Sequence, residues 1–199
     1  MHLFLSVFIK FFFLLTPFFV LTMFLALTKG MDPRGRRLTA LRVTLAVAVV
    51  TLVLFHFGNL IFEVFGITVD SFRIGAGVLL FLSAVSLVRG RAGDEAGQSE
   101  GDISVVPLAI PIAVGPATTG ALLVMGAAMP AQDRLVGSGA LMAAVACLGV
   151  VLVLSAHVRR LLGRLGIEVL TKLTGLILSA LAAQIIFTGV RNFLGLGGS

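Results

Sequence analysis

The stretch LAIPIAVGPATTG, residues 108–120, interrupts an apolar run that extends from residue 103 to residue 129. A run of this length predicts a helix that crosses a membrane, since about 20 apolar residues span a hydrocarbon core of ~30 Å. Pro111 and Pro116 each remove a backbone N–H and free the carbonyl four residues earlier, and Gly115 adds a second weak helix former. The stretch therefore predicts a helix that is broken inside the membrane.

The whole chain has the composition of a membrane protein. Its 199 residues are 58% hydrophobic and only 12% charged, and the mean hydropathy is +1.13. The apolar segments fill most of the chain, so the connections are too short to hold a separate soluble domain. We predict one all-α transmembrane domain, residues 1–199. The six predicted spans are residues 3–27, 41–65, 72–88, 103–129, 135–156 and 170–194.

Basic residues cluster in the first and fifth predicted connections, and these clusters explain much of the net charge of +6. The clusters consist of Lys29, Arg34, Arg36, Arg37 and Arg42, and of Arg159, Arg160 and Arg164. Connections rich in Lys and Arg face the cytoplasm, which places both termini outside. A nucleic-acid partner is not expected, because no folded basic surface faces water.

The two halves of the chain resemble each other. FGITVDSFRIGAGVLLFLSAVSLV from Phe65 and LGIEVLTKLTGLILSALAAQIIFT from Leu165 share four identities at an offset of 100 residues, and Pro17 precedes Pro116 by nearly the same separation. A duplication predicts two three-helix repeats, residues 1–98 and 99–199. Because each repeat has three spans, the second is inverted relative to the first, with the first and fourth helices broken near the midplane.

The two breaks are the predicted substrate site. Irregular backbone inside a membrane occurs only where protein or a water-filled cavity pairs its polar groups, and paired broken spans indicate a transporter's binding site. Half-helix starts offer N–H groups to a carboxylate, and freed carbonyls accept hydrogen bonds from an ammonium group, so a small zwitterion fits. The candidate residues are Thr16, Pro17, Phe18 and Phe19 in the first break, and Gly115, Pro116, Ala117, Thr118 and Thr119 in the second.

Two further polar residues are candidates for substrate contact. Arg73 follows Asp70 by three residues at the start of the third span, where it either forms a local ion pair or binds a substrate carboxylate. Gln184 lies mid-span in the sixth helix, where it needs an interhelical partner or a substrate.

The sequence favours neither an enzyme nor a protein with a metal or other cofactor. We find no nucleophile with a base at a suitable spacing, no phosphate loop and no metal-ligand spacing. Asp and Glu are absent from the middle of the predicted spans, so no carboxylate proton relay is indicated. Cys147, the single cysteine, has no partner for an internal disulfide.

Three stretches resemble the signature segments of the MarC family of six-span bacterial and archaeal inner-membrane proteins. They are FGITVDSFRIGAGVLLFLSAVSLV, DISVVPLAIPIAVGPATTG and LTKLTGLILSALAAQIIFTGV. The resemblance implies a multi-pass protein of the plasma (inner) membrane with both termini periplasmic. Through the family's SnatA branch, it also implies secondary transport, as an exporter of small neutral amino acids of the glycine and alanine class or of a similar small metabolite, by alternating access.

The alternative is a structural or assembly protein of the inner membrane that binds lipid or a partner span and transports nothing. A homo-oligomer is compatible with both functions.

The first break departs from the family pattern. The family usually has Asn-Pro or Asp-Pro there, then a small apolar residue and Gly, with a second Pro five residues after the first. This chain has Thr16, Pro17, Phe18 and Phe19, and Thr22 replaces the second Pro; Ala117 stands where Gly is common in the second break. Either the substrate differs from glycine-sized amino acids or the first-half site is weakened.

The basic clusters generate a test of the topology. Single cysteines at positions 36 and 160 should be shielded from a membrane-impermeant maleimide in intact spheroplasts, and cysteines near Asp70, Asp133 and the C-terminus should react, with Cys147 replaced throughout. Labelling at position 36 but not at position 70 would show that the orientation is the reverse of the predicted one.

Overall fold

The computed structural model describes residues 2–90 and 113–195, and every regular element within these ranges is helical. The elements are α1 (His2–Leu14), α2 (Pro17–Leu27), α3 (Pro33–Phe65), α4 (Val69–Arg89), α7 (Pro116–Ala128), the short 3-10 helix η2 (Ala131–Asp133), α8 (Arg134–Val153) and α9 (Ser155–Phe193). The predicted all-α class is confirmed.

Five described segments are long and apolar enough to cross a membrane. They are His2–Leu27, Pro33–Gly58, Val69–Arg89, Ala131–Val153 and Ser155–Phe193. α7 is apolar but shorter, and it supplies only the second part of the predicted fourth span. The first part of that span, with Pro111, lies outside the described residues, as does the predicted boundary between the two repeats at residue 98.

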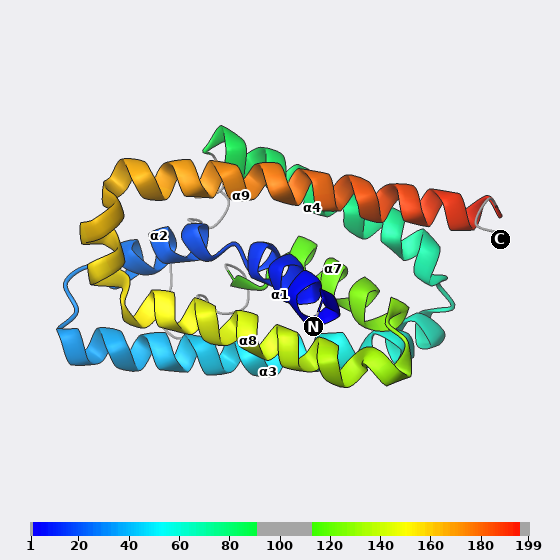
Figure 1. Ribbon diagram of the computed structural model, residues 1–199, viewed down its shortest axis with the longest axis horizontal. Coiled ribbons are helices and arrows are strands. Elements are labelled where there is room, and N and C mark those ends of the chain that lie inside the picture. Colours follow the sequence, from blue (N-terminus) through cyan, green and yellow to red (C-terminus); the bar gives the residue numbers. More distant parts are fainter. Residues whose placement is uncertain (1, 91–112, 196–199) are drawn as a thin grey trace.

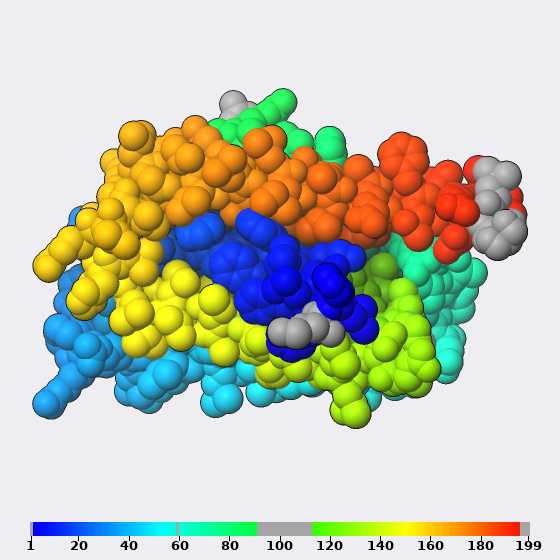
Figure 2. All heavy atoms as spheres, in the orientation of Figure 1, coloured from blue at the N-terminus to red at the C-terminus, as the bar shows by residue number. Residues whose placement is uncertain are grey.

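The helices form three layers (Figure 1). α4 and α9 pack together along one edge, α3 and α8 along the opposite edge, and α1, α2 and α7 lie between them. α1 contacts α8, α7 contacts both α3 and α4, and α2 contacts α9. Figure 2 shows the first two helices held between α8 and α9 on this face. The broken helices are therefore the inner layer.

The predicted break in the first span is confirmed at Thr16. Its backbone is left-handed, with φ 46° and ψ 55°, and α2 begins at the next residue, Pro17. Left-handed backbone is unfavourable for a β-branched residue and persists where the surrounding structure fixes it. The two residues before it, Leu14 and Leu15, are 3% and 1% exposed. This close packing holds the break in place.

The second break is confirmed where the structure describes it. α7 begins at Pro116, and Gly115 before it is extended, with φ −72° and ψ 176°. Proline suits the first position of a helix because the N–H that it lacks would have no helical partner there. Ile112, near which the sequence predicts a freed carbonyl, lies outside the described residues.

The predicted fifth connection has a helical backbone. Residues 157–169 belong to α9, which begins at Ser155 and carries Arg159, Arg160 and Arg164 on a helix. α9 bends at Gly163, where φ is 65° and ψ is 179°, and its first part turns across the end of the bundle (Figure 1). Polarity indicated that the chain leaves the apolar region there, but Leu, Arg and Glu are also good helix formers, so the backbone remains helical.

The start of α3 and the start of α9 lie at the same end of the molecule (Figure 1). Both segments carry the basic clusters that the sequence assigns to the cytoplasmic side. Both clusters therefore assign the same end of the bundle to the cytoplasmic side.

Small residues bring α4 and α9 into close contact. A side chain at Gly77 would meet Ala182 and Ile186, and one at Gly175 would meet Ala84 and Val88. Of the other small residues in these helices, Gly75, Ser83 and Ala180 are exposed. The contacts are reciprocal, because Gly77 and Gly175, Ala84 and Ala182, and Val88 and Ile186 each differ by 98 in residue number.

Glycine also allows α7 to approach α3 at two points. A Cβ at Gly126 would overlap the carbonyl oxygen of Phe55, and a Cβ at Gly58 would lie 2.7 Å from the carbonyl oxygen of Leu123. Backbone cannot move aside as the end of a flexible side chain can, so both positions require glycine.

We expect Gly126→Ala to destabilise the protein by about 1–3 kcal/mol, because the added methyl group forces α7 away from α3. Gly75→Ala is the matched control, since a Cβ there meets nothing within 4 Å and alanine favours a helix. Thermal unfolding of the purified variants in detergent measures both effects. Equal unfolding temperatures for the two variants would contradict the close approach.

Candidate functional site

The two helix breaks meet at one hydrogen bond. The hydroxyl of Thr118 donates to the carbonyl oxygen of Leu14 at 3.4 Å, across 104 residues of sequence, and this contact is buried. Leu14 is the last residue of α1, where carbonyls lack helical partners, and Thr118 lies in the first turn of α7. The bond therefore joins the end of one half-helix to the start of another.

Thr118 differs from most threonines of this chain in what its hydroxyl binds. Thr44 and Thr51 donate to the carbonyls of Ala40 and Val47, four residues back in their own helix. The residue four positions before Thr118 precedes α7, so the hydroxyl is available to the other break. The second break thus supplies a partner for a freed carbonyl of the first.

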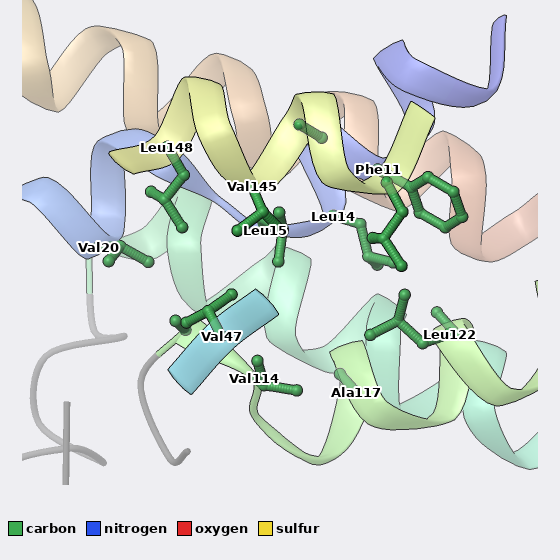
Figure 3. Packing of buried hydrophobic residues seen from close by; sticks show 14 of the residues in the cluster. Phe11, Leu14, Leu15, Val20, Val47, Val114, Ala117, Leu122, Val145 and Leu148 are labelled. Atoms are coloured by element: carbon green, nitrogen blue, oxygen red, sulfur yellow. The ribbon is translucent and has the colours of Figure 1, made fainter. Parts of the chain in front are cut away.

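Apolar side chains enclose the meeting point (Figure 3). Leu14 and Leu15 come from the first break, Val114 and Ala117 from the second, and Val145 from α8, and all five are buried. Protein thus covers the side chains beside both breaks, while Thr16 and Gly115 remain partly exposed. Irregular backbone inside a membrane is tolerated where protein or a water-filled cavity pairs its polar groups.

Each half-helix begins with backbone N–H groups that its own helix leaves unpaired. The first bond across the start of α2 runs from the Val20 N–H to the Thr16 carbonyl at 3.0 Å, and the first in α7 from the Thr119 N–H to the Gly115 carbonyl at 2.9 Å. Between Pro17 and Val20, and between Pro116 and Thr119, lie two residues each. Their backbone N–H groups come before the first helical hydrogen bond and have no acceptor within their own helix. Such groups, at the positive end of a helix dipole, suit an anion.

Two cavities flank the first break. The smaller, which we name the Arg73 cavity, has a volume of about 150 Å³, and the larger, which we name the Phe19 cavity, about 620 Å³. The Arg73 cavity is lined by Lys10, Leu14, Arg73, Leu80, Ala121, Met125, Leu181, Gln184, Ile185 and Thr188. The Phe19 cavity is lined by Phe19, Thr22, Met23, Leu25, Ala26, Lys29, Leu87, Gly90, Arg159, Arg164, Ile167, Glu168, Thr171 and Lys172.

The break lies between the two cavities along the chain. Leu14 lines the Arg73 cavity and Phe19 lines the Phe19 cavity, with Thr16 and Pro17 between them. α4 and α9 line both cavities, each helix with a different part of its length. The cavities therefore lie toward opposite ends of the α4–α9 pair, on either side of the point where the breaks meet.

Arg73 both forms the predicted ion pair and lines a cavity. Its Nη1 lies 2.5 Å from Oδ1 of Asp70, and its side chain is 14% exposed. The same carboxylate oxygen accepts a hydrogen bond of 3.2 Å from Nδ2 of Asn192, which links α4 to the end of α9. The ion pair is thus confirmed, and contact of Arg73 with a substrate stays a prediction.

The structure brings some predicted site residues together and separates others. Gln184 shares the Arg73 cavity with Arg73, while Phe19 lies in the wall of the other cavity. Phe18 lines neither cavity, and its ring packs edge-on against Phe12 with centroids 6.4 Å apart. Around the meeting point, Pro17, Ala117 and Thr118 are buried, Thr16, Gly115 and Thr119 are partly buried, and Pro116 is exposed.

The sequence interpretation overlooked Lys10. This residue lies within the 26-residue apolar segment His2–Leu27, and it lines the Arg73 cavity. The signal was present in the sequence, because a charged residue inside an apolar span is costly and commonly has a function. Within residues 2–90 and 113–195, no group of three or more His, Cys, Asp or Glu side chains is placed to hold a metal ion.

The chain is similar to membrane proteins of bacteria and archaea over nearly its whole length. The chain is 32% identical to a UPF0056 membrane protein of Methanocaldococcus jannaschii, over 96% of this chain and 97% of the relative. It is 31% identical to the UPF0056 membrane protein YhcE of Escherichia coli K12, over 93% and 90%, and 32% identical to the UPF0056 inner membrane protein YhgN of the same strain, over 91% and 92%. No solved structure matches the chain.

The match to the family described as MarC family integral membrane protein covers residues 1–194, which includes both breaks and the residues around both cavities. The chain therefore belongs to the MarC family of integral membrane proteins.

Proposed function

We propose that the protein is a secondary transporter that moves a small amino acid, of the glycine and alanine class, or a similar small metabolite across the membrane by alternating access. The observation that carries the proposal is that the two helix breaks meet at the Thr118–Leu14 hydrogen bond with a cavity on either side. Alternating access requires a central site that communicates with each side in turn.

The substrate binds, in this proposal, where the breaks meet. Its carboxylate accepts hydrogen bonds from the N–H groups at the starts of α2 and α7, and its ammonium group donates to freed carbonyls such as that of Leu14. A single neutral hydrogen bond contributes about 0.5–1.5 kcal/mol, so the Thr118–Leu14 contact can open at low cost when a substrate replaces it.

We propose further that the chain is a 3+3 inverted repeat. The reciprocal contacts of α4 and α9, related by 98 residues, support this arrangement. So does the packing of the inner layer, because α2, which begins at Pro17, contacts α8 and α9 as α7, which begins at Pro116, contacts α3 and α4. An inverted repeat gives the two access states the same architecture, with one half moving against the other.

Flux measurements on the purified protein in liposomes test the proposal. Labelled glycine, alanine, serine and threonine are offered in both directions, with and without pH and sodium gradients. If none of the labelled substrates moves under any of these conditions, the amino-acid transport proposal is wrong, and the alternative of a structural or assembly protein is favoured.

We expect Pro116→Leu to abolish transport while the protein still folds. Leucine restores the backbone N–H and relieves the restriction on Gly115, so α7 can extend and bond its own first N–H groups. The loss of two charge-assisted hydrogen bonds, each about 1.5–3 kcal/mol, weakens binding by a factor of roughly a hundred to ten thousand. Liposome flux and thermal unfolding are both measured.

Pro130→Leu is the matched control for Pro116→Leu, since Pro130 is also exposed and lies just past the other end of α7. It should transport as the wild type does. If Pro116→Leu folds and transports normally as well, the second break is a packing feature and the site lies elsewhere.

We expect Thr118→Val to weaken substrate binding by less than about tenfold, because it removes one neutral hydrogen bond at nearly constant volume. Thr39→Val is its control, since the Thr39 hydroxyl bonds the Gly35 carbonyl in its own helix, away from both cavities. Substrate-dependent thermal shift gives both affinities. A loss as complete as that of Pro116→Leu would mean that the hydroxyl itself binds the substrate.

A further inference from the structure

Lys10 is a charged residue in an apolar surrounding, and it has no carboxylate partner among residues 2–90 and 113–195. The salt bridges of these ranges join Arg73 to Asp70 and Lys172 to Glu168. The Lys10 side chain is partly buried and lines the Arg73 cavity beside Leu14. A charge at such a place is costly unless an opposite charge approaches it.

The Arg73 cavity has an excess of positive charge. Lys10 and Arg73 are charged residues in its lining, and no carboxylate from residues 2–90 or 113–195 lines it. Asp70 neutralises Arg73 and also accepts a hydrogen bond from Asn192, so it is already engaged on the α4–α9 side. Within the described part of the chain, Lys10 is therefore the residue of this lining whose positive charge no carboxylate balances. A ligand that enters this cavity is therefore favoured when it brings one negative charge.

The rest of the lining sets the size and character of such a ligand. Gln184 and Thr188 supply polar side chains from one face of α9, and the other lining residues, apart from Lys10 and Arg73, are apolar. The volume of about 150 Å³ restricts the ligand to a small molecule. These features suit a carboxylate on a short hydrocarbon arm.

The Arg73 cavity adjoins the point where the breaks meet. Leu14 lines the cavity, and its carbonyl oxygen accepts the hydrogen bond from the Thr118 hydroxyl. Ala121 lies about one turn beyond Thr118 on α7 and lines the cavity as well. A molecule bound at the breaks by its amino and carboxylate groups can thus extend a second carboxylate toward Lys10.

The Phe19 cavity has the same sign of charge. Four cationic residues line it, and among the described residues of this lining one carboxylate, that of Glu168, accompanies them and is paired with Lys172. The four are Lys29, Arg159, Arg164 and Lys172. Like-signed charges around a cavity raise the local concentration of an oppositely charged molecule. Both cavities, on either side of the first break, therefore favour an anion over a neutral molecule.

We propose that Lys10 binds the second carboxylate of an acidic amino acid in the Arg73 cavity, so that the protein prefers acidic to neutral amino acids. The inference rests on the proposed transport function, because it places the first carboxylate and the ammonium group at the breaks. It keeps the transport of a small amino acid but replaces the neutral glycine and alanine class by amino acids of net charge −1.

Binding to the purified full-length protein tests this inference separately from transport. The probes are aspartate, glutamate, glycine and alanine, and the readouts are the ligand-dependent shift in unfolding temperature and equilibrium binding of the labelled compounds. The variants are Lys10→Met, which removes the charge and leaves an unbranched side chain one atom shorter, and Lys10→Arg, which keeps the charge. Arg42→Met is the control, since it removes one cation outside both cavities.

We expect the wild type to bind an acidic amino acid at least about tenfold more tightly than a neutral one. One charge-assisted hydrogen bond between Lys10 and the second carboxylate is sufficient for a difference of this size. Lys10→Met should remove this preference and leave the affinity for neutral amino acids within about twofold. Lys10→Arg should retain the preference, and Arg42→Met should leave all affinities unchanged. A purely structural role for Lys10 would instead lower the affinities for acidic and neutral amino acids together.

The outcomes separate the two proposals. Preference of the wild type for neutral amino acids, or an acidic preference that survives Lys10→Met, overturns the role of Lys10 and leaves transport intact. Lys10-dependent binding of aspartate or glutamate without flux in liposomes supports the site and overturns the transporter. Binding of none of the four amino acids overturns both.

Discussion

A backbone N–H or C=O group inside a lipid bilayer has no water to bind, and the arrangement of this protein depends on how that constraint is met at two helix breaks. Pro17 and Pro116 start new helices and leave polar groups without helical partners on both sides. The breaks therefore belong in the protein interior. The α3–α8 and α4–α9 pairs form the outer layers, and Gly77, Gly126 and Gly175 let neighbouring backbones approach closely enough to seal the inner layer.

The positions of the breaks were predictable from the sequence, but their meeting was not. Proline lacks an N–H and clashes with the preceding turn whatever surrounds it, so Pro17 and Pro116 act locally. The Thr118–Leu14 hydrogen bond joins residues that are 104 positions apart, and it exists because α7 packs between α3 and α4 while α1 packs on α8. Only tertiary packing specifies such a contact.

Polarity and sequence identity do not specify backbone conformation, as two segments of this chain show. The basic segment before the last span reads as a connection, yet it is helical up to and beyond the bend at Gly163. The match at an offset of 100 aligns Gly66, which ends α3 in a left-handed conformation, with Gly166, which lies inside α9. The packed glycines and alanines of α4 and α9 instead correspond at 98 residues.

The departures of the first break from the family pattern have a different meaning in the structure than in the sequence. Thr16 stands where Asn or Asp is usual, and its backbone is left-handed, a conformation in which Asn and Asp are strongly enriched among residues other than glycine. Its first effect is therefore backbone strain, on the order of 1–3 kcal/mol, rather than the loss of a side chain for substrate. Phe19 lies in the wall of the Phe19 cavity, and Phe18 packs on Phe12. The break itself keeps its form, because Pro17 and the buried packing of Leu14 and Leu15 maintain it; the substitutions change the strain in the break and the wall of one cavity.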